Sequence, residues 1–259
     1  MKIGEGGRAF AALRMTAQAG AFLADMVFPK NIYCIACNAP LKGDDPMSLC
    51  GDCRKELLLG QPAVCRRCGR FARYPAANFC EGCAAREPLY DRGSAAVVYE
   101  GSARKILYGL KYGGKGYLAE NIAAIMEPVL PAASSYDMIL PVPMHRSKKS
   151  ERGYCQTTLI ARQIAGRTGK PLVPDNLVRI RKTEPMSGLS REKRTANIRG
   201  AFEVKDPAAL AGKRVLLVDD LLTTGSTADE CARVLKQAGA ASVQLAVFAA
   251  TAPRSPEYQ

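Results

Sequence analysis

The chain has 259 residues, of which 47% are hydrophobic and 24% are charged, as in a globular protein with one large domain or a medium and a small one. No apolar run approaches the ~20 residues of a membrane-spanning helix, which argues against an integral membrane protein. The formal net charge is +13, and residues 145–199 hold 14 Lys and Arg against 4 Asp and Glu. This concentration indicates a surface for an anion, such as nucleic acid, a membrane surface or a phosphorylated small molecule. A solvated Arg-rich surface is the alternative.

The N-terminal residues 1–30 are predicted to form a docking helix. Residues 10–26 are apolar and helix-prone, but Arg14 interrupts them and no clean small-residue cleavage site follows. This pattern does not indicate a signal peptide. We therefore expect a cytoplasmic protein.

Residues 31–90 are predicted to form a double zinc ribbon. Four C-x2-C pairs form two consecutive units, C-x2-C-x12-C-x2-C and C-x2-C-x11-C-x2-C. Each pair lets two thiolates from one tight turn reach the same ion at about 2.3 Å. We prefer ligand pairing within each unit to pairing across units, because the repeat is complete in each. The predicted zinc ligands are Cys34, Cys37, Cys50, Cys53, Cys65, Cys68, Cys80 and Cys83.

Disulfides and iron–sulfur clusters are the competing interpretations of these cysteines. Zinc would supply the folding energy of a segment too small to bury a core of its own. A scaffold is therefore the first interpretation of the module, and contact with nucleic acid or a partner is the second. Cys155 and Cys231 stand apart, as ordinary small residues of helices.

Beyond residue 90, short apolar runs alternate with helix-like periodicity. This alternation predicts an α/β domain over residues 91–251, with a mostly parallel sheet and helices on both faces. The polar stretch 181–200 is too basic and too poor in apolar residues for a core, and residues 252–259 are predicted to be a disordered tail. Strands are expected at 95–99, 138–142, 177–180, 201–204, 215–218 and 242–249, and helices at 103–110, 117–126, 156–167 and 226–238.

The stretch VLLVDDLLTTGST, residues 215–227, places two aspartates directly after a buried strand. A Walker B strand would look similar, but it requires a phosphate loop of the form G-x4-G-K-[ST]. Residues 109–116 come close to that form, yet Gly116 stands where the hydroxyl is needed and the preceding segment resembles a helix. A nucleotide hydrolase is therefore disfavoured.

A ribose 5-phosphate explains every residue of this stretch. The free N–H groups at a helix N-terminus bind phosphate, and ionised carboxylates accept hydrogen bonds from a vicinal diol. Asp219 and Asp220 would hold the diol at the carboxyl end of the strand, where ligands bind in such sheets. The residues that would hold the phosphate are Thr223, Thr224, Gly225, Ser226 and Thr227.

The stretch resembles the 13-residue phosphoribosyl-pyrophosphate (PRPP) signature of the type I phosphoribosyltransferases. The wider chain is similar to the ComF family of competence-associated, phosphoribosyltransferase-like proteins. The shared features are the cysteine pairs, LKYGGKG with Lys111 and Tyr112, LPVPMHRSKKSERGY, and SGLSREKRTANIRGAF. Two positions depart from the pattern, because Cys155 stands for an expected Asn and Met186 for an expected Gln.

The resemblance implies Mg2+-dependent transfer of a phosphoribosyl group from PRPP to an unknown acceptor, with release of pyrophosphate. Asp219 and Asp220 would be the catalytic residues at the ribose. His145, the one histidine of the chain, fits a loop hydrogen-bonder better than a general base. The implied pyrophosphate site comprises Met144, His145, Arg146, Lys148 and Arg152, and the implied mobile loop carries Arg191, Lys193 and Arg194.

A second hypothesis belongs to a different class of function. The chain would be a non-catalytic accessory protein of DNA uptake that binds single-stranded DNA and uses the same pocket to sense PRPP or keeps it as a vestige. A helicase or processing protein of DNA uptake would be its partner. The sequence does not decide between a monomer and a homodimer. The basic segment and the zinc ribbons favour DNA, but aromatic residues make up 7% of the chain and show no interleaved row for base stacking.

Overall fold

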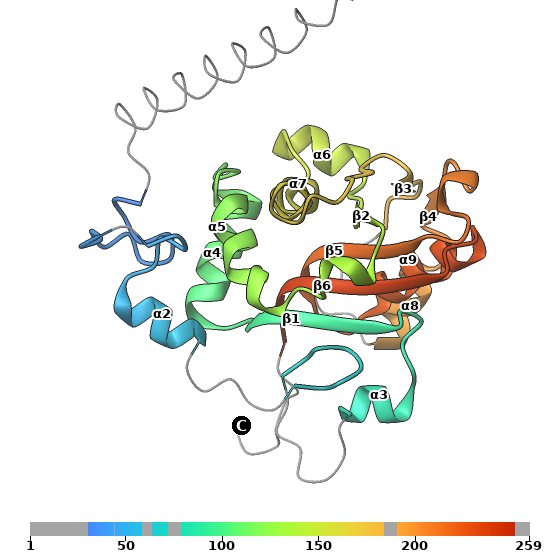
Figure 1. Cartoon of the computed structure of the whole chain (residues 1–259), viewed down its shortest axis with the longest axis horizontal. Coiled ribbons are helices and arrows are strands. Elements are labelled where there is room, and N and C mark those ends of the chain that lie inside the picture. Colours follow the sequence, from blue (N-terminus) through green and yellow to red (C-terminus); the bar gives the residue numbers. More distant parts are fainter. Residues whose placement is uncertain (1–30, 44, 59–63, 72–78, 184–190, 252–259) are drawn as a thin grey trace, which may run out of the picture.

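The computed structural model describes residues 31–43, 45–58, 64–71, 79–183 and 191–251. The predicted N-terminal helix and C-terminal tail lie outside these residues. A central parallel sheet has the strand order β1-β6-β5-β2 (Figure 1). No helix of the described ranges is long and apolar enough to cross a bilayer. The strands are β1 (Arg92–Val98), β2 (Met138–Pro141), β5 (Arg214–Leu222) and β6 (Ser242–Ala250).

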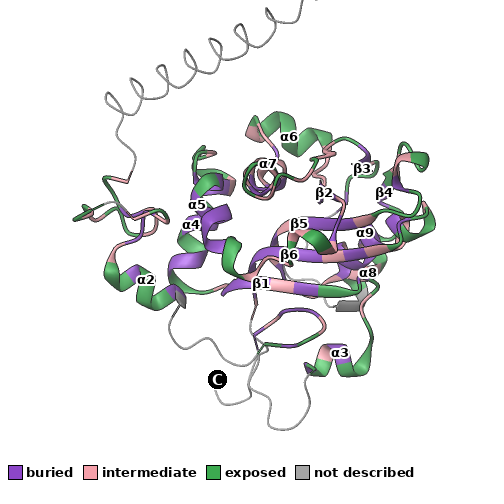
Figure 2. Ribbon diagram, viewed as in Figure 1, coloured by how far each residue is buried: buried purple, intermediate pink, exposed green. Residues whose placement is uncertain are grey.

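Helices cover both faces of this sheet, as predicted. Along β5, Val215 and Leu217 pack against α9 (Ser226–Gln237), whereas Leu216 and Val218 face the opposite side. This alternation divides the interior into two apolar cores with the purple strands between them in Figure 2. The helices of the second face are α4 (Gly101–Tyr112), α5 (Leu118–Met126) and α7 (Gln156–Thr168).

Two of the predicted strands lie outside the main sheet. Strands β3 (Leu177–Arg179) and β4 (Phe202–Val204) pair with each other in an antiparallel sheet of their own. Between them lies α8 (Arg191–Ile198), where the sequence predicted a polar stretch outside the core. That prediction is wrong for Ile198, which is 1% exposed and belongs to the core that contains α9.

The segment after β2, for which the sequence predicted neither helix nor strand, also differs from expectation. It forms α6 (Arg146–Arg152), whose residues are mostly exposed (Figure 2). His145 caps its N-terminus, and Gly153 ends it with a φ of 83°. The cap explains why a helix without an apolar stripe forms here. Short 3-10 turns complete the described fold at Glu127–Val129, Ala133–Ser135 and Ala208–Leu210.

The two cysteine units pack on opposite faces of the sheet. The first continues into α2 (Gly51–Leu58), which lies beside α4, and Cys34 and Cys53 join the core of that face. The second ends in α3 (Glu81–Ala85) below β1 in Figure 1, and its four cysteines join the core that contains α9. The two units therefore contact different parts of the α/β domain.

The backbone of the second unit touches strand β1 directly. A Cβ atom on Gly69 would lie 2.5 Å from the Cα of Ser94, and one on Gly93 would lie 2.5 Å from the carbonyl oxygen of Cys68. The Gly93 N–H donates to the Arg67 carbonyl at 2.8 Å. Glycine at both positions lets the cysteine turn and the strand approach this closely.

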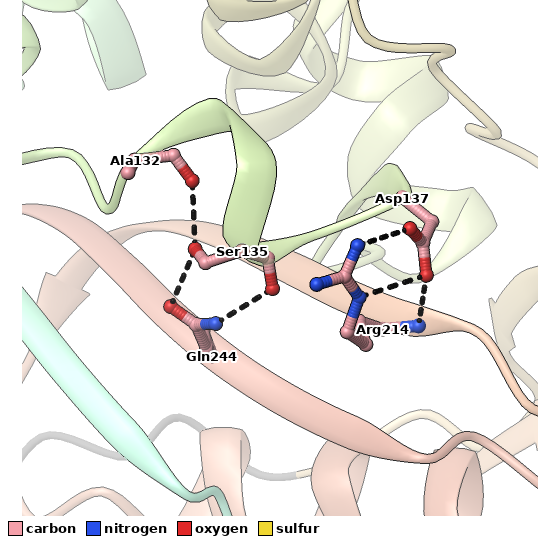
Figure 3. A network of polar contacts seen from close by, with 5 residues as sticks. All are labelled: Ala132, Ser135, Asp137, Arg214 and Gln244. Carbon is pink, nitrogen blue, oxygen red and sulfur yellow. Dashed lines mark hydrogen bonds and ion pairs between the residues drawn. The ribbon is translucent and has the colours of Figure 1, made fainter.

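An ion pair aligns the amino ends of β2 and β5, on the edge opposite the predicted site. Arg214 donates to Asp137 from its side chain at 2.7 and 3.2 Å and from its backbone N–H at 2.9 Å (Figure 3). These side-chain and backbone bonds hold the pKa of Asp137 well below its usual range. Beside them, Gln244 of β6 donates to the Ser135 carbonyl at 3.0 Å. The contacts link the chain before β2 to the two central strands.

Candidate functional site

The eight predicted ligand cysteines form two separate clusters, one in each unit. The sulfur atoms of each cluster all lie within 4.8 Å of one another, which confirms pairing within units. The sulfurs of Cys37 and Cys50 are 3.6 Å apart, as are those of Cys68 and Cys80. Four thiolates at about 2.3 Å from one ion would be about 3.8 Å apart, so both clusters fit tetrahedral zinc.

All ten cysteines are free of disulfides. The cysteines of the second cluster are all buried, whereas Cys37 of the first is exposed. Cys155 and Cys231 are buried outside the clusters, at the N-cap of α7 and within α9. Their positions agree with the prediction that they are ordinary small residues of helices.

Strand β5 runs through both aspartates of the predicted site and ends four residues later than predicted. Consecutive strand residues point to opposite faces, so the two carboxylates have different neighbours. The buried Asp220 carboxylate lies 2.7 Å from the Lys111 ammonium and accepts a 2.7 Å bond from the Gln156 amide. Both of its oxygens are thus engaged by residues of α4 and α7.

Lys111 is charged where it meets Asp220. Burial lowers the pKa of the Lys111 ammonium, but the charge and hydrogen bond of Asp220 outweigh this and raise it above its ordinary value. Gln156 in turn accepts a 2.6 Å bond from Arg152, at the end of α6. The network therefore joins Asp220 to the basic helix that follows β2.

Asp219 faces a small cavity on the other side of the strand. The cavity is lined by Asp219, Arg194 of α8 and residues 221–228. Burial, followed by the charge of Asp220, raises the pKa of the Asp219 carboxyl to about 7. Among the described atoms, the Nε atoms of Arg194 and Arg179 are buried without a hydrogen-bond partner. The cavity thus combines a carboxylate with a cation whose buried N–H is unsatisfied.

The loop between β5 and α9 forms the floor of this cavity, and we call residues 223–227 the phosphate loop. Gly225 has a φ of 86° and is the N-cap of α9, so the first N–H groups of the helix have no partner within it. The Ser226 hydroxyl lies 3.1 Å from the hydroxyls of Thr224 and of Thr195 on α8. Backbone N–H groups and hydroxyls therefore converge where the sequence predicted a phosphate site.

The segment after β2 leaves the sheet beside the two aspartates. The Val142 N–H donates to the Val218 carbonyl at 2.8 Å, so the segment begins beside β5 one residue before Asp219. His145 Nδ1 accepts from the Ser147 N–H at 3.3 Å and lies 2.8 Å from the Ser147 hydroxyl. The histidine is thus a local hydrogen-bonder, as the sequence analysis preferred.

The structure gathers only part of the predicted site in one place. Asp219, Arg194 and the phosphate loop line one cavity, and Asp220 is linked to Arg152 through Gln156. Arg146 and Lys148 are exposed on α6, and Lys193 is exposed on α8. Arg191 begins α8. The predicted residues thus divide between the cavity and a basic surface beside it.

Sequence reasoning missed three residues of this region. Gln156 follows Cys155, one of the two departures from the family pattern, and its bond to Asp220 has no local signal beyond that motif. Arg179 of β3 lies near Asp219, whose charge partly offsets the lowering of the Arg179 pKa by burial. Arg70 of the second cysteine unit donates to the Thr223 carbonyl in the phosphate loop. No sequence pattern connects residues so far apart.

Known families match both parts of the chain. The phosphoribosyl transferase domain family matches residues 154–258, and the double zinc ribbon domain family matches residues 23–84. The chain is 27% identical to competence protein F of Haemophilus influenzae over 83% of this chain and 95% of that protein. It is 29% identical to the DNA utilization protein YhgH of Salmonella typhimurium over 76% of this chain and 94% of that protein.

Among solved structures, adenine phosphoribosyltransferase from Thermoanaerobacter pseudethanolicus matches 56% of this chain and 86% of its own, with 19% identity and a TM-score of 0.35. The relatives in sequence are matched over nearly their whole length, across both the cysteine units and the α/β domain. The chain therefore combines a double zinc ribbon domain with a phosphoribosyl transferase domain, and it is a homologue of these competence and DNA utilization proteins.

Proposed function

We propose that this chain binds PRPP at the carboxyl edge of its sheet and transfers the phosphoribosyl group to an acceptor, with release of pyrophosphate. The observation that carries the proposal is the cavity in which Asp219, Arg194 and the N-terminus of α9 meet. An anion-binding helix end beside a carboxylate suits a ligand with a phosphate at one end and a diol at the other. Ribose 5-phosphate, the common part of PRPP and its products, has this form.

In this proposal, the phosphate loop holds the 5-phosphate and Arg194 adds a positive charge. Asp219 is the carboxylate that faces the ribose diol from inside the cavity. Asp220 already has both oxygens engaged, so it reaches the ligand only by sharing or exchanging its bonds to Lys111 and Gln156. The pyrophosphate would lie toward Met144, His145 and the cations of α6, namely Arg146, Lys148 and Arg152.

The chemistry requires no nucleophilic side chain. Displacement at C1 of PRPP passes through a state with positive charge on the ribose, which a nearby carboxylate stabilises. Mg2+ would be carried largely by the pyrophosphate and ribose oxygens, and Asp219 is the carboxylate among the described residues that line this cavity. The chain's own contribution is orientation, charge and the exclusion of water by α8, whose Thr195 lies against Ser226.

Titration calorimetry with PRPP and Mg2+, and separately with ribose 5-phosphate, tests this proposal. Binding of both ligands, weakened by Thr224→Val, supports the site, whereas absence of binding to the parent protein contradicts it. Release of pyrophosphate on addition of an acceptor distinguishes an enzyme from a PRPP sensor. The eight clustered thiols need a reducing compartment to stay free for zinc, so we place this activity in the cytoplasm.

A second candidate function, binding of single-stranded DNA, has its own structural support. Tyr108 and Tyr112 are exposed one turn apart on α4, with ring centroids 5.2 Å apart. The Arg152 guanidinium lies 5.4 Å from the Tyr112 ring centroid. Exposed aromatic rings with a guanidinium close to one of them, beside a basic helix, offer what single-stranded nucleic acid requires. Two of the matched relatives are called a competence protein and a DNA utilization protein, which agrees with this partner.

The test for this surface is fluorescence anisotropy with a labelled single strand and its duplex. If the parent protein prefers the single strand and Tyr112→Ala loses this preference, the result supports base stacking. Equal affinity for the duplex would instead indicate attraction to the phosphate backbone alone.

A further inference from the structure

The second cysteine unit lies directly against the phosphate loop. Arg70 follows Cys68 by two residues, and its guanidinium Nη2 donates to the backbone carbonyl of Thr223, 153 residues further along the chain. The Arg70 carbonyl itself accepts from the Cys65 N–H at 2.9 Å. The turn that presents the cysteine ligands therefore also sets the position of Arg70.

The packing around this bond is continuous. One cavity is lined on one side by Cys68, Cys80 and Cys83 and on the other by Thr224 and Gly225. Buried Tyr90, which follows the second unit, points its hydroxyl to within 3.8 Å of where a Gly225 Cβ would lie. The buried thiol cluster and the phosphate loop are thus neighbours across one small space.

A second tether holds the first turn of α9, next to the phosphate loop. Buried Asp229 accepts a 2.9 Å bond from the Leu89 N–H and lies 3.7 Å from the Arg86 guanidinium. Both of these residues follow the last cysteine pair. The first unit attaches elsewhere, through Glu56, which accepts from the Ser102 N–H of α4 at 3.2 Å.

The bond from Arg70 controls the direction of a predicted phosphate donor. A trans peptide is planar, so the Thr223 carbonyl and the Thr224 N–H point in opposite directions. When Arg70 draws the carbonyl toward the second unit, the Thr224 N–H points away from that unit. Such fixed N–H groups bind an anion without reorganisation when it arrives.

We infer that Arg70 is a positioning residue for the phosphate loop, and that the second zinc site helps to shape the ligand site rather than serving only as a remote scaffold. This inference rests on the proposed function, because the loop is taken to bind the 5-phosphate. Zinc bound by the second unit would fix the turn from which Arg70 reaches across. Loss of that turn would release the Thr223 carbonyl without any change in the loop sequence.

Three variants of the full chain test the inference: Arg70→Met, Arg70→Lys, and the control Arg66→Met at an exposed position of the same cysteine turn. The measurements are ribose 5-phosphate affinity by calorimetry, amide hydrogen exchange of residues 222–228, and zinc content. Loss of one hydrogen bond from a charged donor predicts roughly tenfold weaker binding for Arg70→Met. We also expect faster exchange in the loop with zinc content unchanged, an intermediate result for Arg70→Lys, and parental behaviour for Arg66→Met.

Parental affinity and parental exchange in Arg70→Met would overturn the inference. If Arg70→Met does not fold, Arg70→Lys decides, because it keeps the charge and removes the planar guanidinium fork. If the parent protein does not bind ribose 5-phosphate, the proposed function fails. The exchange of residues 222–228 still decides whether Arg70 holds the loop, so the two failures are distinguishable.

Discussion

The Lys111 ammonium and the Asp220 carboxylate lie 2.7 Å apart and join the last turn of α4 to strand β5. Because Gln156 takes the other oxygen, Asp220 is fully engaged without a ligand. Asp219, one residue earlier, faces the cavity at the phosphate loop. The two adjacent aspartates, which look equivalent in the sequence, therefore have different surroundings. Asp220 belongs to a polar network, and Asp219 faces the cavity proposed for the ligand.

Replacing each aspartate by asparagine should separate these roles. Asp219→Asn is expected to weaken ribose 5-phosphate binding about ten- to a hundredfold, because a charged acceptor of the diol is lost. Asp220→Asn should lower the free energy of unfolding by about 1.5–3 kcal/mol, because Lys111 loses its charged partner. Melting temperature and ligand affinity, measured on both variants, check the assignment, and identical behaviour of the two would contradict it.

Ligand affinity should depend on pH through Asp219. Burial raises the pKa of this carboxyl to about 7, so the protonated form dominates at lower pH and cannot serve as an ionised acceptor. Affinity for ribose 5-phosphate should fall by up to about tenfold per pH unit below pH 7 and level off above it. Asp219→Asn should keep only the dependence that comes from titration of the ligand's own phosphate. An unchanged pH profile in this variant would show that Asp219 does not control binding.

The same pKa shift makes a prediction for stability. The folded-state pKa of Asp219 lies above its unfolded value, so its ionisation disfavours the folded state as pH rises from about 4 to 7. Asp219→Asn should therefore melt at least as high as the parent protein at pH 8. Calorimetry at pH 5 and pH 8 measures the thermal midpoints of both proteins. The midpoint of the variant minus that of the parent should be larger at pH 8 than at pH 5. A lower midpoint at pH 8 would mean that the ionised carboxylate is held by stabilising contacts.

The basic helix α6 should affect ligands that carry pyrophosphate. Arg146→Ala is expected to weaken PRPP binding by a few-fold while ribose 5-phosphate binding stays the same, since an exposed cation contributes modestly. Calorimetry with both ligands at low and at physiological salt measures the difference. Equal losses for the two ligands would argue against a pyrophosphate site at α6.

The exposed tyrosines should affect nucleic acid and not PRPP. Tyr112→Ala should cost about 1–3 kcal/mol in affinity for a short single strand, with the salt dependence unchanged. Tyr33→Ala, an exposed tyrosine of the first cysteine unit, is the matched control. Substitution of Lys148 and Lys149 should instead lower affinity for every sequence and flatten the salt dependence. Anisotropy titrations over a range of salt concentrations distinguish these effects.

The two zinc sites should differ in their effect on ligand binding. Purified protein is expected to contain about two zinc ions per chain, with one lost in either Cys34→Ser or Cys65→Ser. Because the second unit touches the phosphate loop, Cys65→Ser should lose ribose 5-phosphate binding more completely than Cys34→Ser. Zinc analysis and calorimetry on the same samples measure both effects. A metal-free protein with disulfides would contradict the zinc assignment itself.

Short segments of the sequence determined the parts of this protein that depend on local spacing. The C-x2-C pairs fixed which cysteines share a cluster, because each unit carries all four ligands of its site. The aliphatic run before Asp219, followed by the glycine and hydroxyl residues, placed a buried strand before a helix N-terminus. The sequence did not predict helices α6 and α8, because neither has an apolar stripe. Helix α6 is stabilised by its N-cap, and α8 is held by the burial of one residue, Ile198.

Only the tertiary structure decided how the site is assembled. Gln156 and Asp220 are 64 residues apart, and Arg70 and Thr223 are 153 apart, yet each pair shares a hydrogen bond. Tyr112 and Arg152 lie at the ends of different helices, and only the fold brings the guanidinium to 5.4 Å from the ring centroid. Periodicity and motif spacing report the chain's local geometry. Which distant side chains face one another is set by the packing of elements around the sheet, and no segment of the chain carries that information by itself.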